Sequence, residues 1–278
     1  MLFFLPCPSL SPVRANDEAV VYLLDVSFFT FRAYYALPEL NTSDGVPTNA
    51  VHGVATMLER LIRTEEPKHL AACFDSAGKT FRTEIYPDYK ANRDEPDDAL
   101  KTQFPLVRRL IEAMAIPSIG LDGYEADDLL GTLAKKLSGA GARVVIVTGD
   151  KDLMQCVSDS VSLYDPVRDK RVRQAEVFEK FGVPPSAVTD VQGLMGDSTD
   201  NIPGVKGVGP KTATALIAHF GSLEETLARI EEIEGLAIRG AKSVRKKVEE
   251  GAADARLSKR LATVREDLPL GLELDDLI

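Results

Sequence analysis

Three aspartates stand at the ends of three short apolar segments of the sequence. These segments are Val20 to Asp25 (VVYLLD), Leu70 to Asp75 (LAACFD) and Val144 to Asp150 (VVIVTGD). Each is typical of a buried strand in a parallel sheet. Because the carboxyl ends of such strands line the ligand crevice, we expect Asp25, Asp75 and Asp150 to converge there. For Asp25 alone, capping of the following helix is an equal alternative.

Six further acids lie in short motifs. Glu125, Asp127 and Asp128 open a predicted helix in YEADDLL, where Glu125 and Asp128 share a face at a spacing of three. The motifs TGDKDL and GDSTDNIPG add Asp152, Asp197 and Asp200. Acids are also favoured in any first helical turn, which is the structural alternative for the YEADDLL motif.

Together these carboxylates favour a metal site. Two converging carboxylates repel each other by about 4 kcal/mol at an effective dielectric constant of roughly 20, so cations are needed to hold the group together. No cysteine or histidine lies in the acidic motifs, and His52, His69 and His219 stand outside them. An all-oxygen ligand set predicts Mg²⁺ or Mn²⁺ rather than zinc or copper. A histidine-based mechanism has no candidate residues.

The segment Ile202 to Ala213 (IPGVKGVGPKTA) predicts contact with a nucleic-acid backbone. Its glycines allow a close approach of the main chain, and a helix then begins with free N–H groups that can meet a phosphate. This spacing matches a helix-hairpin-helix, which grips DNA without reading bases. An ordinary glycine turn before a helix is the alternative. The expected DNA contacts here are Gly204, Lys206, Gly207, Gly209, Lys211 and Thr212.

Strands and helices alternate in the first part of the chain. Helical periodicity covers residues 50–64, 101–115 and 126–137. This order predicts an α/β fold with a parallel sheet. From about Pro185 the strand signals stop, which predicts a smaller helical region at the end. The basic and aromatic segment Gly78 to Pro96 is longer than most connections, so we expect it to be functional or disordered.

The composition is that of an ordinary folded protein. The 278 residues are 44% apolar, and the formal net charge of -10 is unusual for a protein that binds nucleic acid. The acids gather in the motifs above, however, while basic residues gather at 79–93 and 239–265. Cys7, Cys73 and Cys156 predict neither a disulfide framework nor a zinc site, which favours a reducing compartment.

Residues 1–16 are expected to form a disordered tail or a leader. They are apolar and proline-interrupted and lack the basic start of a secretory signal. No apolar segment approaches the roughly 20 residues of a membrane span. We therefore expect a cytoplasmic, nucleoid-associated bacterial protein without membrane contact, or an organellar protein if the tail is a leader.

Six motifs in order give a resemblance to a known family. They are LLDVS at the first strand, FD at Phe74 and Asp75, YKANR at Tyr89 to Arg93, GYEADD at Gly123 to Asp128, TGDKDL at Thr148 to Leu153, and GDSTDNIPGVKGVGPKTA at Gly196 to Ala213. From Val20 to Leu268 the chain resembles the 5′ nuclease family, in particular the 5′-3′ exonuclease domain of bacterial DNA polymerase I, its stand-alone relatives and flap endonucleases. The resemblance implies a PIN-like α/β core over residues 17–185 with a helical arch at about 78–100. It further implies a helical DNA-binding region over residues 186–278, with a helix-hairpin-helix at about 202–220.

The resemblance implies two metal ions. The ligands of the first would be mainly Asp75, Glu125, Asp127 and Asp128, with Asp25 nearby. The ligands of the second would be Asp150, Asp152, Asp197 and Asp200, a set that this sequence retains in full. Mg²⁺ is the expected ion and Mn²⁺ its substitute, and K⁺ is expected at the helix-hairpin-helix.

The resemblance also assigns roles to the basic segment. Lys90 and Arg93 would face the scissile phosphate and neutralise charge as it reacts. Arg32, in the helix after the first strand, would add a phosphate contact. The residues expected to hold the unpaired 5′ strand are Phe81, Arg82 and Tyr89, because aromatic and basic groups together suit stacking and backbone contact. Taken alone, such a segment is more often a solvated surface loop.

The activity implied is structure-dependent 5′-3′ exonuclease and 5′ flap endonuclease cleavage of DNA. Two-metal hydrolysis would leave a 5′-phosphorylated fragment and a 3′-hydroxyl without a covalent intermediate. The expected partner of a monomeric enzyme is DNA with 5′ ends, flaps or nicks, and also RNA primers, in primer or flap removal during replication and repair. Polymerase activity is not implied, because the chain ends where DNA polymerase I would continue.

Three other functions are alternatives. A non-catalytic DNA-binding protein could use the helix-hairpin-helix alone, but it would not need the acids, which oppose DNA until metals neutralise them. A PIN-type ribonuclease shares the α/β core and a carboxylate site but is shorter. A phosphatase of small molecules would also place aspartates after strands. The long basic segment and the GVGPK turn favour the 5′ nuclease over the last two.

Overall fold

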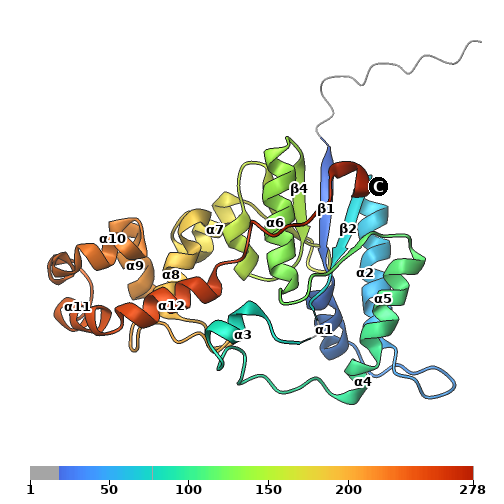
Figure 1. The fold of residues 1–278 in the computed structure, drawn as a ribbon, viewed down its shortest axis with the longest axis horizontal. Coiled ribbons are helices and arrows are strands. Elements are labelled where there is room, and N and C mark those ends of the chain that lie inside the picture. Colours follow the sequence, from blue (N-terminus) through green and yellow to red (C-terminus); the bar gives the residue numbers. More distant parts are fainter. Residues whose placement is uncertain (1–18, 77, 278) are drawn as a thin grey trace, which may run out of the picture.

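The first part of the chain builds a six-stranded sheet with helices on both faces (Figure 1). The computed structural model describes residues 19–76 and 78–277, so the expected tail of residues 1–16 lies outside the described residues. The strand order is β3-β2-β1-β4-β5-β6, and every neighbouring pair is parallel except β5 and β6. The strands are β1 (Val20–Asp25), β2 (His69–Cys73), β3 (Ser118–Ile119), β4 (Arg143–Val147), β5 (Val161–Asp165) and β6 (Lys170–Val172).

The predicted parallel sheet is confirmed, but two of its strands are shorter than expected. β2 ends two residues before Asp75 and β4 ends three residues before Asp150. Directly after β4 the Asp150 N–H donates to the Thr148 hydroxyl at 3.0 Å, which stabilises the turn of the backbone away from the sheet. Asp75 and Asp150 therefore stand on the loops that follow the strands, and only Asp25 is a strand residue.

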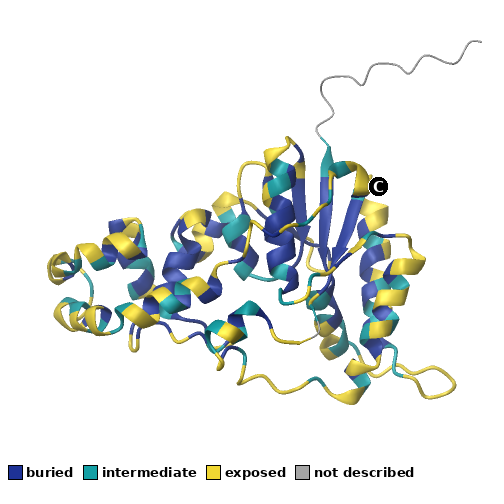
Figure 2. Cartoon of the chain, viewed as in Figure 1, coloured by how far each residue is buried: buried dark blue, intermediate teal, exposed yellow. Residues whose placement is uncertain are grey.

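Two helical layers cover the sheet. The helices of this part are α1 (Val26–Ala36), α2 (Asn49–Glu65), α5 (Gln103–Ala113), α6 (Ala126–Gly139) and α7 (Gln174–Phe181). Alternate residues of the central strands face opposite sides, and both sides are buried (Figure 2). Leu24 and Val147 pack in one cluster with α2 and α5, while Leu23 and Ile146 pack in the other with α6. Burial on both faces explains the continuous apolar segments in the sequence.

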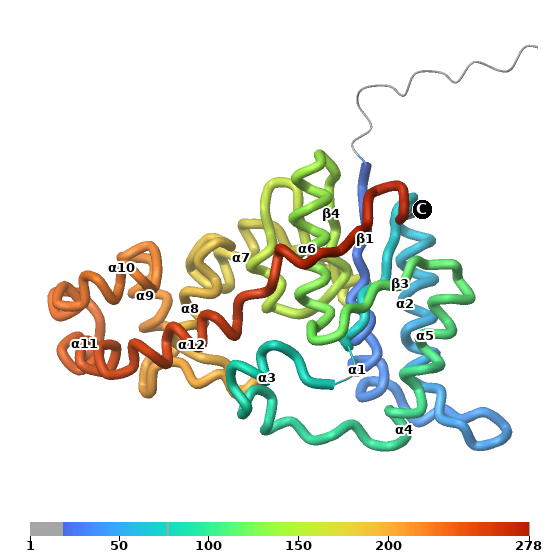
Figure 3. The backbone as a smooth tube through the Cα atoms, in the orientation of Figure 1, coloured from blue at the N-terminus to red at the C-terminus, as the bar shows by residue number. Residues whose placement is uncertain are grey.

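The second part is helical, as predicted from Pro185 onward. Residues 173–277 are all described and contain no strand. Their elements are the 3₁₀ turn η2 (Pro185–Ala187), α8 (Val188–Met195), α9 (Pro210–Phe220), α10 (Leu223–Ala228), η3 (Ile230–Gly235), α11 (Ala241–Glu250), α12 (Ala252–Ala262) and η4 (Leu274–Leu277). After α12 the chain runs back along α6 to the sheet (Figure 3), where Lys136 Nζ donates to the Leu272 carbonyl over 2.7 Å.

The basic segment crosses between the two parts. It contains α3 (Phe81–Ile85) and is followed by α4 (Asp98–Lys101), and residues 86–97 between these helices form turns and irregular backbone. The helical portion of the expected arch is thus confined to these two short helices. No described helix is both long and apolar enough to cross a membrane.

Candidate metal and nucleic-acid site

An open cleft of about 400 Å³ lies at the carboxyl ends of β1, β2 and β4. Its acidic lining comes from several separate segments of the chain. The carboxylates that line it are Asp25, Asp75, Glu125, Asp127, Asp150 and Asp200. The structure therefore brings Asp25, Asp75 and Asp150 together, as the strand pattern predicted.

Asp25 caps a helix and lines the cleft at the same time. Its Oδ1 accepts from the Phe28 N–H at 3.0 Å, which caps α1, and its Oδ2 accepts from the Thr148 hydroxyl at 2.8 Å. Burial raises the pKa of Asp25 to about 7, helped by the charges of Asp75 and Asp150 and against the effect of the two hydrogen bonds. Asp25 thus both caps α1 and lines the cleft, so the two alternatives for this residue are compatible.

Asp127 and Asp75 complete the first group of acids around Asp25. Burial, followed by the charges of Asp150 and Asp25, raises the pKa of Asp127 well above its ordinary value. Asp75 is exposed, and its Oδ1 accepts from the Ala126 N–H at 2.7 Å. Such crowding of like charges is what divalent cations relieve.

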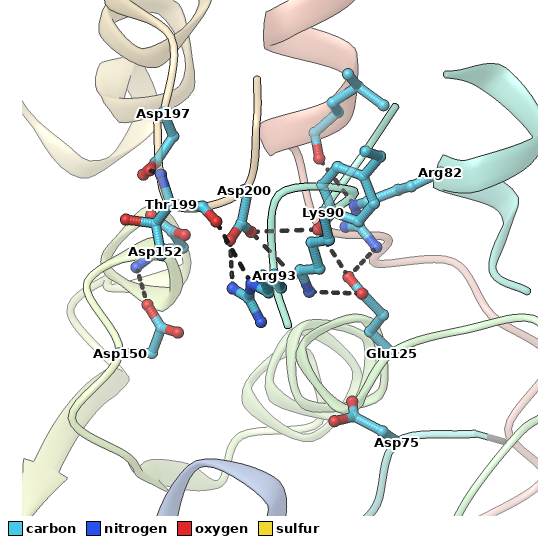
Figure 4. A network of polar contacts seen from close by, with 12 residues as sticks. Asp75, Arg82, Lys90, Arg93, Glu125, Asp150, Asp152, Asp197, Thr199 and Asp200 are labelled. Atoms are coloured by element: carbon cyan, nitrogen blue, oxygen red, sulfur yellow. Dashed lines mark hydrogen bonds and ion pairs between the residues drawn. The ribbon is translucent and has the colours of Figure 1, made fainter. Parts of the chain in front are cut away.

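The second group of acids lies beside the first (Figure 4). Burial and the charge of Asp150 raise the pKa of Asp152 to about 7. Gln192 Nε2 holds Asp152 Oδ1 at 2.7 Å. Asp197 forms an ion pair with Lys151, and although burial would raise the pKa of Asp197, this partner lowers it.

Cationic side chains of the basic segment enter the cleft between the two groups (Figure 4). Lys90 Nζ lies 2.6 Å from Glu125 Oε1, and Arg93 forms an ion pair with Asp200. Burial would lower the pKa of Lys90, but Glu125 and Asp200 outweigh it, so that the pKa is raised and the amine stays charged. The Tyr89 hydroxyl donates to Glu125 Oε2 at 3.0 Å.

Hydrogen bonds to main-chain carbonyls hold this segment on the turn that follows α8. The Lys90 N–H donates to the Asp200 carbonyl at 2.9 Å, and Asn92 Nδ2 donates to the Ser198 carbonyl at 2.7 Å. Asn201 Nδ2 returns a bond to the Asp88 carbonyl at 2.7 Å. These bonds explain how residues more than 100 positions apart in the sequence share one cleft.

Several expected DNA contacts are placed differently from the prediction. Arg82 is 2% exposed and is bonded to Glu125 and Asp128, so its guanidinium offers no surface to a strand. Tyr89 is also buried. Phe81 is half-buried, with the Arg82 guanidinium 4.6 Å from its ring centre. Arg32 does line the cleft, where it is paired at 2.7 Å with Asp165.

Sequence reasoning missed the polar residues that position the acids. Thr148 holds Asp25, Gln192 holds Asp152, and Lys151 is paired with Asp197. Thr148 and Lys151 lie inside the TGDKDL motif, so that motif was a signal for both. Gln192 carried no signal, because α8 places it beside the cleft from 40 residues away.

The predicted hairpin joins α8 to α9. Gly204 is buried with φ 59°, and its N–H donates to the Ser258 hydroxyl at 2.8 Å. Gly209 precedes Pro210, the first residue of α9, a position that suits proline because it has no N–H to leave unpaired. Of the expected DNA contacts, Lys206, Gly207, Gly209 and Lys211 are exposed, and Thr212 is half-buried.

The donors in the cleft suit a hard divalent cation. Oxygen ligands crowd together there, and burial with like charge already destabilises their ionised forms. Among residues 19–76 and 78–277, no three acidic, histidine or cysteine side chains are arranged around one point as ligands. Glu125 and Asp200 are instead paired with Lys90 and Arg93.

Two family descriptions together match residues 20–278. Residues 20–182 match "5'-3' exonuclease, N-terminal resolvase-like domain", and residues 183–278 match "5'-3' exonuclease, C-terminal SAM fold". A 5′-3′ exonuclease of Aquifex aeolicus is 40% identical over 257 residues, which cover 92% of this chain and 86% of that protein. DNA polymerase I of Rhizobium leguminosarum is 42% identical over 266 residues, and the chain spans only 26% of its length.

Solved structures share the fold. The zinc-bound 5′-exonuclease of T5 is 20% identical, with a TM-score of 0.71 over 87% of this chain and 89% of that one. The flap endonuclease of bacteriophage T5 in a complex with DNA and metal ions is 22% identical, with a TM-score of 0.70 over 87% of this chain and 88% of that one. With both parts of the chain matched in order, this protein is a nuclease that belongs to the 5′-3′ exonuclease family.

Proposed function

We propose that this chain is a Mg²⁺-dependent 5′-3′ exonuclease and flap endonuclease that removes 5′ strands, including RNA primers, during replication and repair. The observation that carries the proposal is the acidic cleft, which Lys90 and Arg93 enter from the basic segment. Relatives that are stand-alone exonucleases or parts of DNA polymerase I support it. The enzyme is proposed to act as a monomer in the bacterial cytoplasm, with residues 17–185 as catalytic core and residues 186–278 as DNA-binding region.

The acids are proposed to act as ligands and not as nucleophiles. Asp75, Glu125 and Asp127, with Asp25 nearby, would hold one Mg²⁺ or Mn²⁺. The acids proposed for a second ion are Asp150, Asp152, Asp197 and Asp200. When bound, such ions supply an activated water and stabilise charge on the phosphate during in-line attack.

Lys90 and Arg93 are proposed to change partners during the reaction. In the structure they neutralise Glu125 and Asp200. If Glu125 and Asp200 held cations instead, Lys90 and Arg93 would be free to hold the scissile phosphate and to stabilise the developing charge. The hairpin glycines and Lys206 and Lys211 would grip the duplex backbone, and K⁺ would bind at this hairpin. Recognition would then depend on DNA shape more than on sequence.

The test is cleavage of a 5′-labelled flap DNA and of a matched plain duplex. Parallel substrates carry an RNA 5′ strand, and each reaction contains Mg²⁺, Mn²⁺ or EDTA. We expect metal-dependent release of the flap, and a loss of at least about a hundredfold in Asp75→Ala, which removes an acid of the cleft. Glu112→Ala, an exposed acid near the end of α5, is the matched control and keeps wild-type activity. Tight binding without cleavage in either metal would instead support a non-catalytic DNA-binding protein.

A further inference from the structure

The acids of the GYEADD motif point in two directions. Glu125 and Asp127 line the cleft, whereas Asp128 is fully buried and does not line it. Asp128 Oδ1 accepts from Arg82 Nη2 at 2.8 Å and from the Arg265 N–H at 2.9 Å. Its Oδ2 accepts from Arg82 Nη1 at 2.7 Å and from the Glu125 N–H at 3.2 Å. Four donors thus occupy the four lone-pair positions of this carboxylate.

The hydrogen-bond donors of Arg82 are likewise all used. Its Nε donates to the Leu261 carbonyl at 2.8 Å, and Nη2 reaches the Thr263 carbonyl at 3.3 Å as well as Asp128. Nη1 donates to Glu125 Oε2 at 3.1 Å in addition to Asp128. All five N–H donors of the guanidinium therefore have partners inside the protein. A paired ion this deeply buried is costly to separate, because each partner would be left charged and unsolvated.

We propose that Asp128 and Arg82 are positioning residues, that Asp128 is not a metal ligand, and that Arg82 does not contact DNA. Through Arg82, the ion pair holds the carboxylate of Glu125. Arg82 also ties α3, near the start of the basic segment, to the end of α12. Glu125 thereby lines the cleft, and so does Asp127, one residue before Asp128. The part of this inference that concerns ligands rests on the proposed metal-dependent function.

The same change from aspartate to asparagine at positions 127 and 128 tests which of the two acids is a metal ligand. Mn²⁺ binding to the DNA-free protein is measured by the electron paramagnetic resonance signal of free Mn²⁺, and the melting temperature is measured in EDTA. Asp127→Asn is expected to weaken Mn²⁺ binding by about tenfold or more without lowering the melting temperature. Asp128→Asn is expected to change Mn²⁺ affinity by less than about threefold and to lower the melting temperature by about 5 °C or more. An affinity loss in Asp128→Asn equal to that in Asp127→Asn would overturn the proposal.

A double-mutant cycle of melting temperatures tests the ion pair between Arg82 and Asp128 without any metal. Arg82→Gln, Asp128→Asn and the double variant are compared in EDTA. We expect the double variant to lose less melting temperature than the sum of the single losses, because either single change leaves a buried charge unpaired. Additive losses would overturn the pairing. A wild-type protein that binds no Mn²⁺ would contradict the proposed function, and the cycle would still decide the pairing.

Discussion

At the scale of single residues, the buried acids of the cleft lower the stability of the metal-free folded protein at neutral pH. Asp25 and Asp152 each have a pKa raised to about 7, first by burial and then by neighbouring carboxylates. A folded-state pKa above the unfolded value means that ionisation disfavours the folded state as pH rises. The metal-free protein therefore carries, at neutral pH, a strain that cations remove when they bind.

Asp25→Asn should relieve part of that strain. The amide oxygen can still cap α1, and the amide group can donate to the Thr148 hydroxyl, so the variant keeps the local bonds. In EDTA at pH 8 the variant is expected to be more stable than the parent, on the order of a few kcal/mol for a shift of this size. The difference should shrink as pH falls through about 7 and vanish near pH 4, where the unfolded chain also begins to bind the proton.

Melting curves at pH 4, 6 and 8 measure this dependence. Asp44→Asn, in the exposed loop before α2, is the control and should melt like the parent at each pH. An equal difference between Asp25→Asn and the parent at all three pH values would show that the carboxylate does not titrate in this range.

The sequence identified the acids by type and motif, but not the direction of each side chain. A spacing of three suggested that Glu125 and Asp128 work on one face, whereas the structure turns Asp127 to the cleft and Asp128 inward. The reason is the partner: Arg82 lies 46 residues before Asp128, and no local pattern reveals a buried ion pair across that distance.

At the scale of elements, the hairpin between α8 and α9 shows how glycines differ in what they do. The sequence predicted close main-chain approach at Gly204 and Gly209 alike. A Cβ added at Gly204 would stand 2.3 Å from the Gly196 nitrogen, at a φ of 59° that disfavours side chains. At Gly209 a Cβ would meet nothing within 4 Å.

Gly204→Ala should therefore destabilise the hairpin by about 2 kcal/mol or more. Gly209→Ala is the matched control and should cost within about 1 kcal/mol, the usual effect of alanine at a helix cap. Urea unfolding gives both free energies, and a duplex-binding assay shows whether the hairpin still grips DNA. Equal losses in the two variants would mean that the close packing of Gly196 and Gly204 does not exist in solution.

Element order was predictable where the strands are buried on both faces, and not at the sheet edges. β1 and α6 follow their apolar patterns, with β1 matching its predicted bounds. The edge strands β3 and β6 have two and three residues, which is too short for any alternating pattern. Contacts with the neighbouring strand define them: β3 pairs with the distant β2, whereas β6 pairs with β5 across a short turn.

At the scale of the whole molecule, charge layout decides how an acidic protein can bind DNA. The net charge is -10, yet the acids of the cleft are partly neutralised by Lys90, Arg93 and Lys151. Away from the cleft, the hairpin carries exposed lysines, including Lys211 in the first turn of α9. Duplex affinity should thus come mainly from the second part of the chain.

The salt dependence of DNA binding by Lys211→Ala tests whether the hairpin supplies duplex affinity. Each phosphate contact releases condensed counterions, so the affinity for DNA falls with salt at a slope set by the number of contacts. On the Asp75→Ala background, which prevents cleavage, Lys211→Ala should weaken duplex binding and reduce the slope of log affinity against log salt by about 1. Lys68→Ala, which changes an exposed lysine just before the start of β2 and away from the hairpin, should leave both unchanged. If the two variants had the same slope, the hairpin would not be a phosphate contact, and the basic segment would have to supply the duplex affinity.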